Sequence, residues 1–141
     1  MPAFAGRVAG TWAACYSGGV KEIFFAAVIA FALQAPSADD HKAWMDAASD
    51  AQEDFRDAMT SKSGAKVAEA GAKLEDLMTK TLNYWQAKHA ADGAKLTQQT
   101  IAQAKAIESS AKANRLNAAQ AAFEKMTASC NACHALHLEK R

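Results

Sequence analysis

The sequence predicts an all-α fold, an antiparallel up-down-up-down four-helix bundle. Only two prolines and seven glycines interrupt 141 residues that are rich in alanine, lysine, glutamine and glutamate, which are good helix formers. Through residues 39–141, apolar side chains recur at steps of three and four, the spacing that gives a helix one apolar face. Short polar breaks separate these periodic segments, and short connections place neighbouring helices antiparallel.

Residues 1–38 differ from the rest and are expected to form a signal segment. The eleven residues 23–33, IFFAAVIAFAL, form an apolar run that follows Lys21 and precedes small residues, as in a secretory signal. As a helix this run would be about 16 Å long, well short of the roughly 30 Å hydrocarbon core of a membrane. We therefore expect only a transient contact with the membrane, cleavage near Ala38, and a periplasmic domain of residues 39–141.

The first two helices of that domain are predicted from their apolar stripes. Asp39 or Asp40 can cap the first, and SKSG at residues 61–64 ends it. Its stripe consists of Met45, Ala48, Phe55 and Met59. The second helix is expected over residues 65–90, before a turn at Asp92 and Gly93. Its stripe consists of Val67, Ala70, Leu74, Leu77, Thr81 and Tyr84, widened by Met78, Leu82 and Trp85.

The third and fourth helices are separated by a polar break at residues 114–117. The third is expected over residues 97–113, with a thin stripe of Ile101, Ala104, Ile107 and Ala111. The fourth has an unbroken 3-4 alternation, typical of a helix in a bundle, which consists of Leu116, Ala119, Phe123, Met126, Cys130, Cys133 and His137.

Residues 130–134, CNACH, admit three interpretations. In a c-type haem site the two thiols of CxxCH bind the haem and the adjacent histidine coordinates its iron. A dithiol oxidoreductase needs its CxxC at the start of a helix, where the dipole lowers a thiol pKa, but here the pair lies deep in the last helix. Zinc would take Cys130, Cys133, His134 and His137, and four ligands on less than two turns of one helix do not easily surround a tetrahedral ion. The pattern favours covalent haem.

A four-helix chain with CxxCH close to its C-terminus resembles the class II c-type cytochromes, which are the cytochrome c-prime group and its low-spin relatives. The residues that carry the resemblance are 116–134, LNAAQAAFEKMTASCNACH. The resemblance implies one covalent haem c, with Cys130 and Cys133 as thioether anchors and His134 as the proximal ligand of the iron. The chain departs from the family at His137 and Leu138, where members commonly carry an aromatic residue and an arginine.

The sixth coordination position of the iron divides this family. In low-spin members a methionine near the start of the first helix binds the iron and the protein carries electrons, whereas high-spin members have an open distal site that binds small gases. Met45 matches that methionine, because the start of the first helix and His134 lie at the same end of an antiparallel bundle. Met59 is fourteen residues further along, about 21 Å, and does not reach. The alternatives are a core role for Met45 with open iron, and His41 as the ligand.

Aromatic residues at the same end are expected to surround the haem, namely Trp44, Tyr84 and Trp85. Tyr84 or Trp85 would then be a hydrogen-bond donor to a haem propionate. His89 is expected to be exposed, and His137 to lie in the bundle seam or on the surface.

The expected function is that of a periplasmic monohaem cytochrome that passes single electrons between redox partner proteins, with His134 and Met45 on the iron. The alternatives are a protein that binds NO or CO at a five-coordinate haem and, in another class, a CxxC thiol oxidoreductase. The chain shows no catalytic constellation, so no enzymatic activity is expected. Its 16 basic and 15 acidic residues lack the basic excess of a nucleic-acid-binding surface. Monomer and homodimer both stay open.

Overall fold

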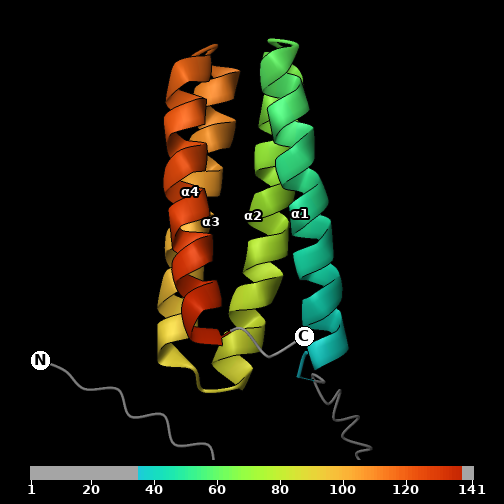
Figure 1. The fold of residues 1–141 in the computed structure, drawn as a ribbon, viewed down its shortest axis with the longest axis vertical. Coiled ribbons are helices and arrows are strands. Elements are labelled where there is room, and N and C mark those ends of the chain that lie inside the picture. Colours follow the sequence, from blue (N-terminus) through green and yellow to red (C-terminus); the bar gives the residue numbers. More distant parts are fainter. Residues whose placement is uncertain (1–34, 138–141) are drawn as a thin grey trace, which may run out of the picture. The chain divides into compact units, whose positions relative to one another are not determined.

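The computed structural model describes residues 35–137, which form four α-helices. These are α1 (Ala38–Thr60), α2 (Gly64–Ala87), α3 (Ala91–Lys112) and α4 (Leu116–His137). The helices run alternately up and down, so the predicted all-α four-helix bundle is confirmed (Figure 1). None of the helices in the described range is long and apolar enough to cross a membrane. The predicted apolar signal run at residues 23–33 lies outside the described residues.

Helix α1 begins with a capping box that the sequence analysis did not identify. The N-cap is Ser37, whose hydroxyl accepts a hydrogen bond from the backbone N–H of Asp40 at 3.0 Å. The Asp40 carboxylate accepts in return from the Ser37 backbone N–H at 2.9 Å. These bonds from Ser37 hold the pKa of Asp40 below its usual value. The prediction of Asp39 or Asp40 as the cap was therefore wrong, because Asp40 occupies the N3 position of a reciprocal pair.

The three connections between the helices share one geometry. Each is three residues long, and its middle residue, Lys62, His89 or Asn114, has a positive φ of 52°, 55° or 55°. In each, the following N–H reaches a carbonyl five residues back, as in the bond from Ser63 to Ala58 at 2.9 Å, which closes the helix end as in a Schellman motif. Asp92 and Gly93, predicted as a turn, instead lie in the first turn of α3, because the chain reverses at His89.

The close backbone contacts join α1 to α2, α2 to α3 and α3 to α4, whereas α1 and α4 stay further apart. We call the interface between these two helices the α1–α4 seam. Phe55 and Phe123 bridge it with stacked rings whose centroids are 4.1 Å apart. The predicted stripe of α2 is buried throughout. The largest fully buried side chains of the core are Phe55, Leu74, Ile107, Met126 and Val67.

Candidate functional site

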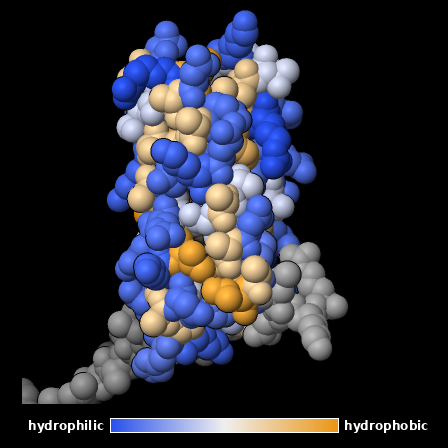
Figure 2. Space-filling model, turned by 60° about the vertical axis from the view of Figure 1, so that its left-hand side comes forward, coloured by the Kyte–Doolittle hydropathy of each residue, from blue (hydrophilic) through white to orange (hydrophobic). Residues whose placement is uncertain are grey.

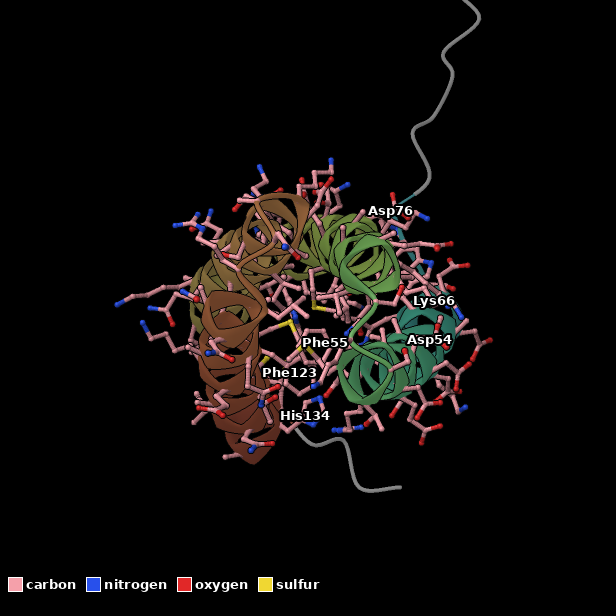
Figure 3. The ribbon with its side chains drawn as sticks, turned by 90° about the horizontal axis from the view of Figure 1, so that it is seen from above. Asp54, Phe55, Lys66, Asp76, Phe123 and His134 are labelled. Carbon is pink, nitrogen blue, oxygen red and sulfur yellow. The ribbon has the colours of Figure 1, made fainter. Side chains whose placement is uncertain are left out.

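The CNACH segment lies in the last turns of α4. Cys130 and Cys133 are half-buried, whereas His134 is exposed and makes no hydrogen bond or ion pair within residues 35–137. Eleven residues are about three helical turns, so His134 lies within about 20° of Phe123 on the surface of α4. Figure 3 shows Phe55 and Phe123 between the two helices and His134 on the side of α4 that faces α1. His134 is therefore directed toward the α1–α4 seam.

Met45 faces the same seam from α1. The Phe55 ring stacks on Phe123, and the Arg56 guanidinium lies over the same ring, 5.5 Å from its centroid, so both mark the side of α1 that is turned to α4. Trp44 precedes Phe55, and Met45 precedes Arg56, by eleven residues, just as His134 follows Phe123 by eleven residues. Because the helices are antiparallel, both steps lead about 16 Å toward the same end of the bundle. Met45 and His134 thus lie at one level of the seam, on the faces that the two helices turn toward each other.

The α1 surface near this level is apolar and combines two large side chains with small alanines. Trp44, Met45 and Ala47 are half-buried and pack against the core, and Ala48 and Ala51 are buried. Leu136, which is 63% exposed, lies near the same end on α4. Figure 2 shows strongly apolar atoms near the lower end of the face in view, whereas polar atoms cover much of the rest.

Both thiols are close to polar groups of α3, although Cys130 lies within about 20° of Phe123 on the surface of α4 and only Cys133 is turned further round, by about 80°. Burial raises the pKa of Cys130, and hydrogen bonding to Thr100 of α3 opposes part of this rise. Burial also raises the pKa of Cys133, and the nearby Asp92 carboxylate raises it further. Both thiols therefore stay protonated to a higher pH than an ordinary cysteine. Across residues 35–137, three or more His, Cys, Asp or Glu side chains nowhere gather in an arrangement that would hold a metal ion.

Four aromatic side chains from three helices close this end of the bundle, and we call them the aromatic cluster: His41, Tyr84, Trp85 and His137. His41 of α1 stacks on Tyr84 of α2 with centroids 4.2 Å apart and planes 1° apart. Trp85 meets the edges of both rings and lies 4.6 Å from the His137 ring of α4. The Lys88 ammonium lies over Tyr84 at 5.6 Å.

Asp92 connects the aromatic cluster to the start of α3. Its carboxylate accepts a hydrogen bond from the Gly93 backbone N–H at 2.8 Å and lies 3.2 Å from Nε2 of His137. The bond from Gly93 holds the pKa of Asp92 below its usual value, and His137 contributes in the same direction. Asp92 thereby links the first turn of α3 to the last turn of α4.

Trp85 has the most constrained ring of the aromatic cluster. A Cβ on Gly93 would lie 2.8 Å from Cδ2 of Trp85, so only a glycine lets α3 approach the ring this closely. The side chain is 8% exposed, and its Nε1 is inaccessible to solvent and has no hydrogen-bond acceptor within the described residues. The indole N–H is thus a buried donor without a partner.

The structure therefore brings the predicted site residues to one end of the bundle, although not all in contact. Met45 and His134 lie at one level of the seam, Cys130 and Cys133 lie near Thr100 and Asp92 of α3, and His89 is exposed as predicted. Sequence reasoning missed the pairing of Asp92 with His137 and the close approach of Gly93 to Trp85. The sequence indicated only that His137 belongs to the α4 stripe, and this spacing did not identify the residue with which it pairs.

Comparison with protein family models, with curated protein sequences and with solved structures finds no match to this chain.

Proposed function

We propose that residues 39–141 form a periplasmic monohaem c-type cytochrome, similar to the low-spin class II cytochromes, that carries single electrons between redox partner proteins. Cys130 and Cys133 are its thioether anchors, His134 is the proximal iron ligand and Met45 is the distal ligand. The observation that carries the proposal is the placement of Met45 and His134 at one level of the α1–α4 seam, next to a CxxCH motif.

The residues at this end fit a haem in shape and polarity. A haem is flat and largely apolar, and the seam is the side on which the backbones of neighbouring helices stay apart. Small alanines line α1 there, and the half-buried Trp44 and Met45 would bury more of their apolar surface against a macrocycle. The unpartnered N–H of Trp85 is a donor of the kind that a haem carboxylate would satisfy.

The last turns of α4 supply three of the groups that would hold the haem. The half-buried thiols of Cys130 and Cys133 would bind it covalently, and the exposed His134 would present its imidazole to the seam. Met45 approaches from the opposite helix, so the two ligands come from elements that the rest of the bundle holds in place. The bound haem supplies the one-electron couple. A thioether ligand and the apolar walls would favour the reduced state over a bis-histidine site.

The pKa values of the thiols argue against a thiol oxidoreductase. A catalytic CxxC needs a thiol whose pKa is lowered, usually by a helix N-terminus or a neighbouring cation. Here burial raises the pKa of both thiols, and the nearest charged side chain that acts on Cys133 is the carboxylate of Asp92. The pair also lies at the C-terminal end of α4, where the dipole disfavours a thiolate.

Gas binding is the second candidate function, because Met45 also packs against the core. A side chain that is half-buried in an alanine-rich seam has an adequate role as a packing residue. If the Met45 sulfur stays in that position, the iron is five-coordinate and open to NO or CO.

The test is to express the full chain in a bacterium that attaches haem c, and to compare Met45→Leu with Met59→Leu. Met59 is also half-buried on α1, about 21 Å further from this end, which makes it a matched control. We expect haem that stays on the chain in a denaturing gel, and a low-spin reduced spectrum that only Met45→Leu converts to high spin with carbon monoxide binding. A wild-type protein that already binds carbon monoxide would establish the gas-binding alternative. The absence of covalent haem from the wild type would overturn both.

A further inference from the structure

Trp85 carries a feature that the haem ligands do not explain. Its indole N–H is buried and has no acceptor within residues 35–137. A buried donor without a partner destabilises the fold, because it has lost its hydrogen bond to water and gained none. Buried polar groups are therefore nearly always hydrogen-bonded, and each exception indicates a missing partner.

The ring cannot turn to find an acceptor within the fold. Gly93 supports one face so closely that not even a Cβ would fit, and the ring also contacts its neighbour Tyr84, His41 of α1 and His137 of α4. The carboxylate at this cluster, Asp92, accepts from the Gly93 N–H and pairs with His137. Since the indole N–H has no partner within residues 35–137, its acceptor comes from outside them.

We infer that Trp85 donates its indole hydrogen bond to a propionate carboxylate of the haem, and so acts as a positioning residue that fixes the orientation of the macrocycle in the seam. This inference rests on the proposed function. The propionates are the only strong acceptors that the organic part of a haem offers. Trp85 is assigned as the donor because its N–H is buried and lacks a partner within the described residues.

The bond has an electrostatic consequence for the iron. An ionised propionate near the haem stabilises the oxidised iron, and an N–H that donates to the carboxylate disperses part of its negative charge. The charged and titratable groups at the aromatic cluster are His41 from α1, Lys88 from α2, Asp92 from α3 and His137 from α4. Loss of the Trp85 bond is therefore expected to lower the reduction potential at constant pH.

The experiment replaces Trp85 with benzothienylalanine, in which a sulfur atom takes the place of the indole N–H and the ring shape is kept. The same replacement at Trp44, the half-buried tryptophan of α1, is the matched control. All proteins are prepared with haem attached and checked for covalent haem on a denaturing gel. Three quantities are measured. The first is the set of nuclear Overhauser contacts of the indole protons in the reduced, diamagnetic protein, to which carbon monoxide is added if the iron is open. The others are the propionate bending bands in resonance Raman spectra and the midpoint potential of the haem.

We expect the wild type to show a contact between the Trp85 indole proton and a propionate methylene. We also expect a shifted propionate band and a lower potential on replacement of Trp85, and a smaller change of both on replacement of Trp44, where the altered ring contacts the haem through packing alone. A wild type with covalent haem but without that contact overturns the inference and leaves the proposed function intact. The same holds for a propionate band that the Trp85 replacement does not move. A wild type without covalent haem overturns both.

Discussion

Phe55 of α1 and Phe123 of α4 stack across the α1–α4 seam with their centroids 4.1 Å apart and their planes 7° apart. Both rings are buried, although the backbones of their helices do not come into close contact. The stack therefore sets the separation of α1 and α4 above the level of Met45 and His134. Its position three turns away from both residues makes it the closed end of the region in which we place the haem.

Removal of either ring should destabilise the bundle, and the two losses should not add. Phe55→Ala and Phe123→Ala should each lower the free energy of unfolding by about 3 to 5 kcal/mol, because each leaves a cavity. The stacked pair should contribute a coupling of about 0.5 to 1.5 kcal/mol in a double-mutant cycle measured by urea unfolding. Leu136→Ala, at an exposed position, is the control and should change the free energy by less than about 0.5 kcal/mol. Strictly additive losses would show that the rings do not interact.

Gly93→Ala should disturb Trp85, whereas Gly64→Ala should not. The Cβ of an alanine at residue 93 would lie 2.8 Å from the Trp85 ring, which is held on its other sides. We expect a loss of about 1 to 3 kcal/mol and a changed near-ultraviolet circular dichroism signal of tryptophan. At residue 64 the nearest atom would be the Ala111 carbonyl oxygen at 3.4 Å, an ordinary contact. Unchanged stability and an unchanged signal in Gly93→Ala would contradict the packing described for Trp85.

Asp92 should contribute stability that disappears in acid. Its pKa is lowered by the hydrogen bond from Gly93 and by His137. A carboxylate with a lowered pKa stabilises the fold at pH values above its unfolded pKa of about 3.9, and this contribution is lost as the pH falls through the lowered folded value. The melting temperature of the wild type should therefore exceed that of Asp92→Asn near pH 6, and the difference should shrink below about pH 4. A difference that is constant from pH 3 to pH 6 would exclude a role for the charge.

The thiols of haem-free protein should react slowly at neutral pH. Burial raises the pKa of both Cys130 and Cys133, so few thiolates are present and alkylation by iodoacetamide should be slower than in the urea-unfolded chain. Asp92→Asn removes the charge that raises the pKa of Cys133 and should accelerate alkylation there more than at Cys130. Mass spectrometry of the alkylated peptides measures both rates. Rapid alkylation of either folded thiol at pH 7 would instead indicate a stabilised thiolate and favour the oxidoreductase alternative.

The fold was predictable because periodicity depends on each helix alone. The α2 stripe from Val67 to Tyr84 is buried as its spacing indicated, and Cys130 and His137 of the α4 stripe are half-buried. The helix boundaries were harder to predict from the sequence. The turn at His89 has no glycine or proline to mark it, and the Asp92-Gly93 pair that looked like a turn begins α3 instead.

The details of the candidate site depend on how separate helices are aligned, and this alignment is set by the three turns. The motif at residues 130–134 and the candidate Met45 could be read directly from the sequence. The contacts of His137 with Trp85 and Asp92 could not, because a shift of one residue in either turn that bounds α3 would separate them. A glycine at residue 93 is consistent either with a turn or with a close approach of its helix to a neighbouring side chain. Only the position of the Trp85 ring decides between the two interpretations.

The close helix pairs of this bundle, α1–α2, α2–α3 and α3–α4, all join segments that are consecutive in the chain. Such a topology has a low contact order, and proteins of low contact order fold within microseconds to milliseconds. The first and last helices, whose pairing closes the largest loop, make fewer close backbone contacts than the three consecutive pairs. We therefore expect the three hairpins to form before haem attachment, and the covalent modification to occur on a chain that is already helical. The cofactor would then act as the long-range cross-link that the polypeptide topology omits.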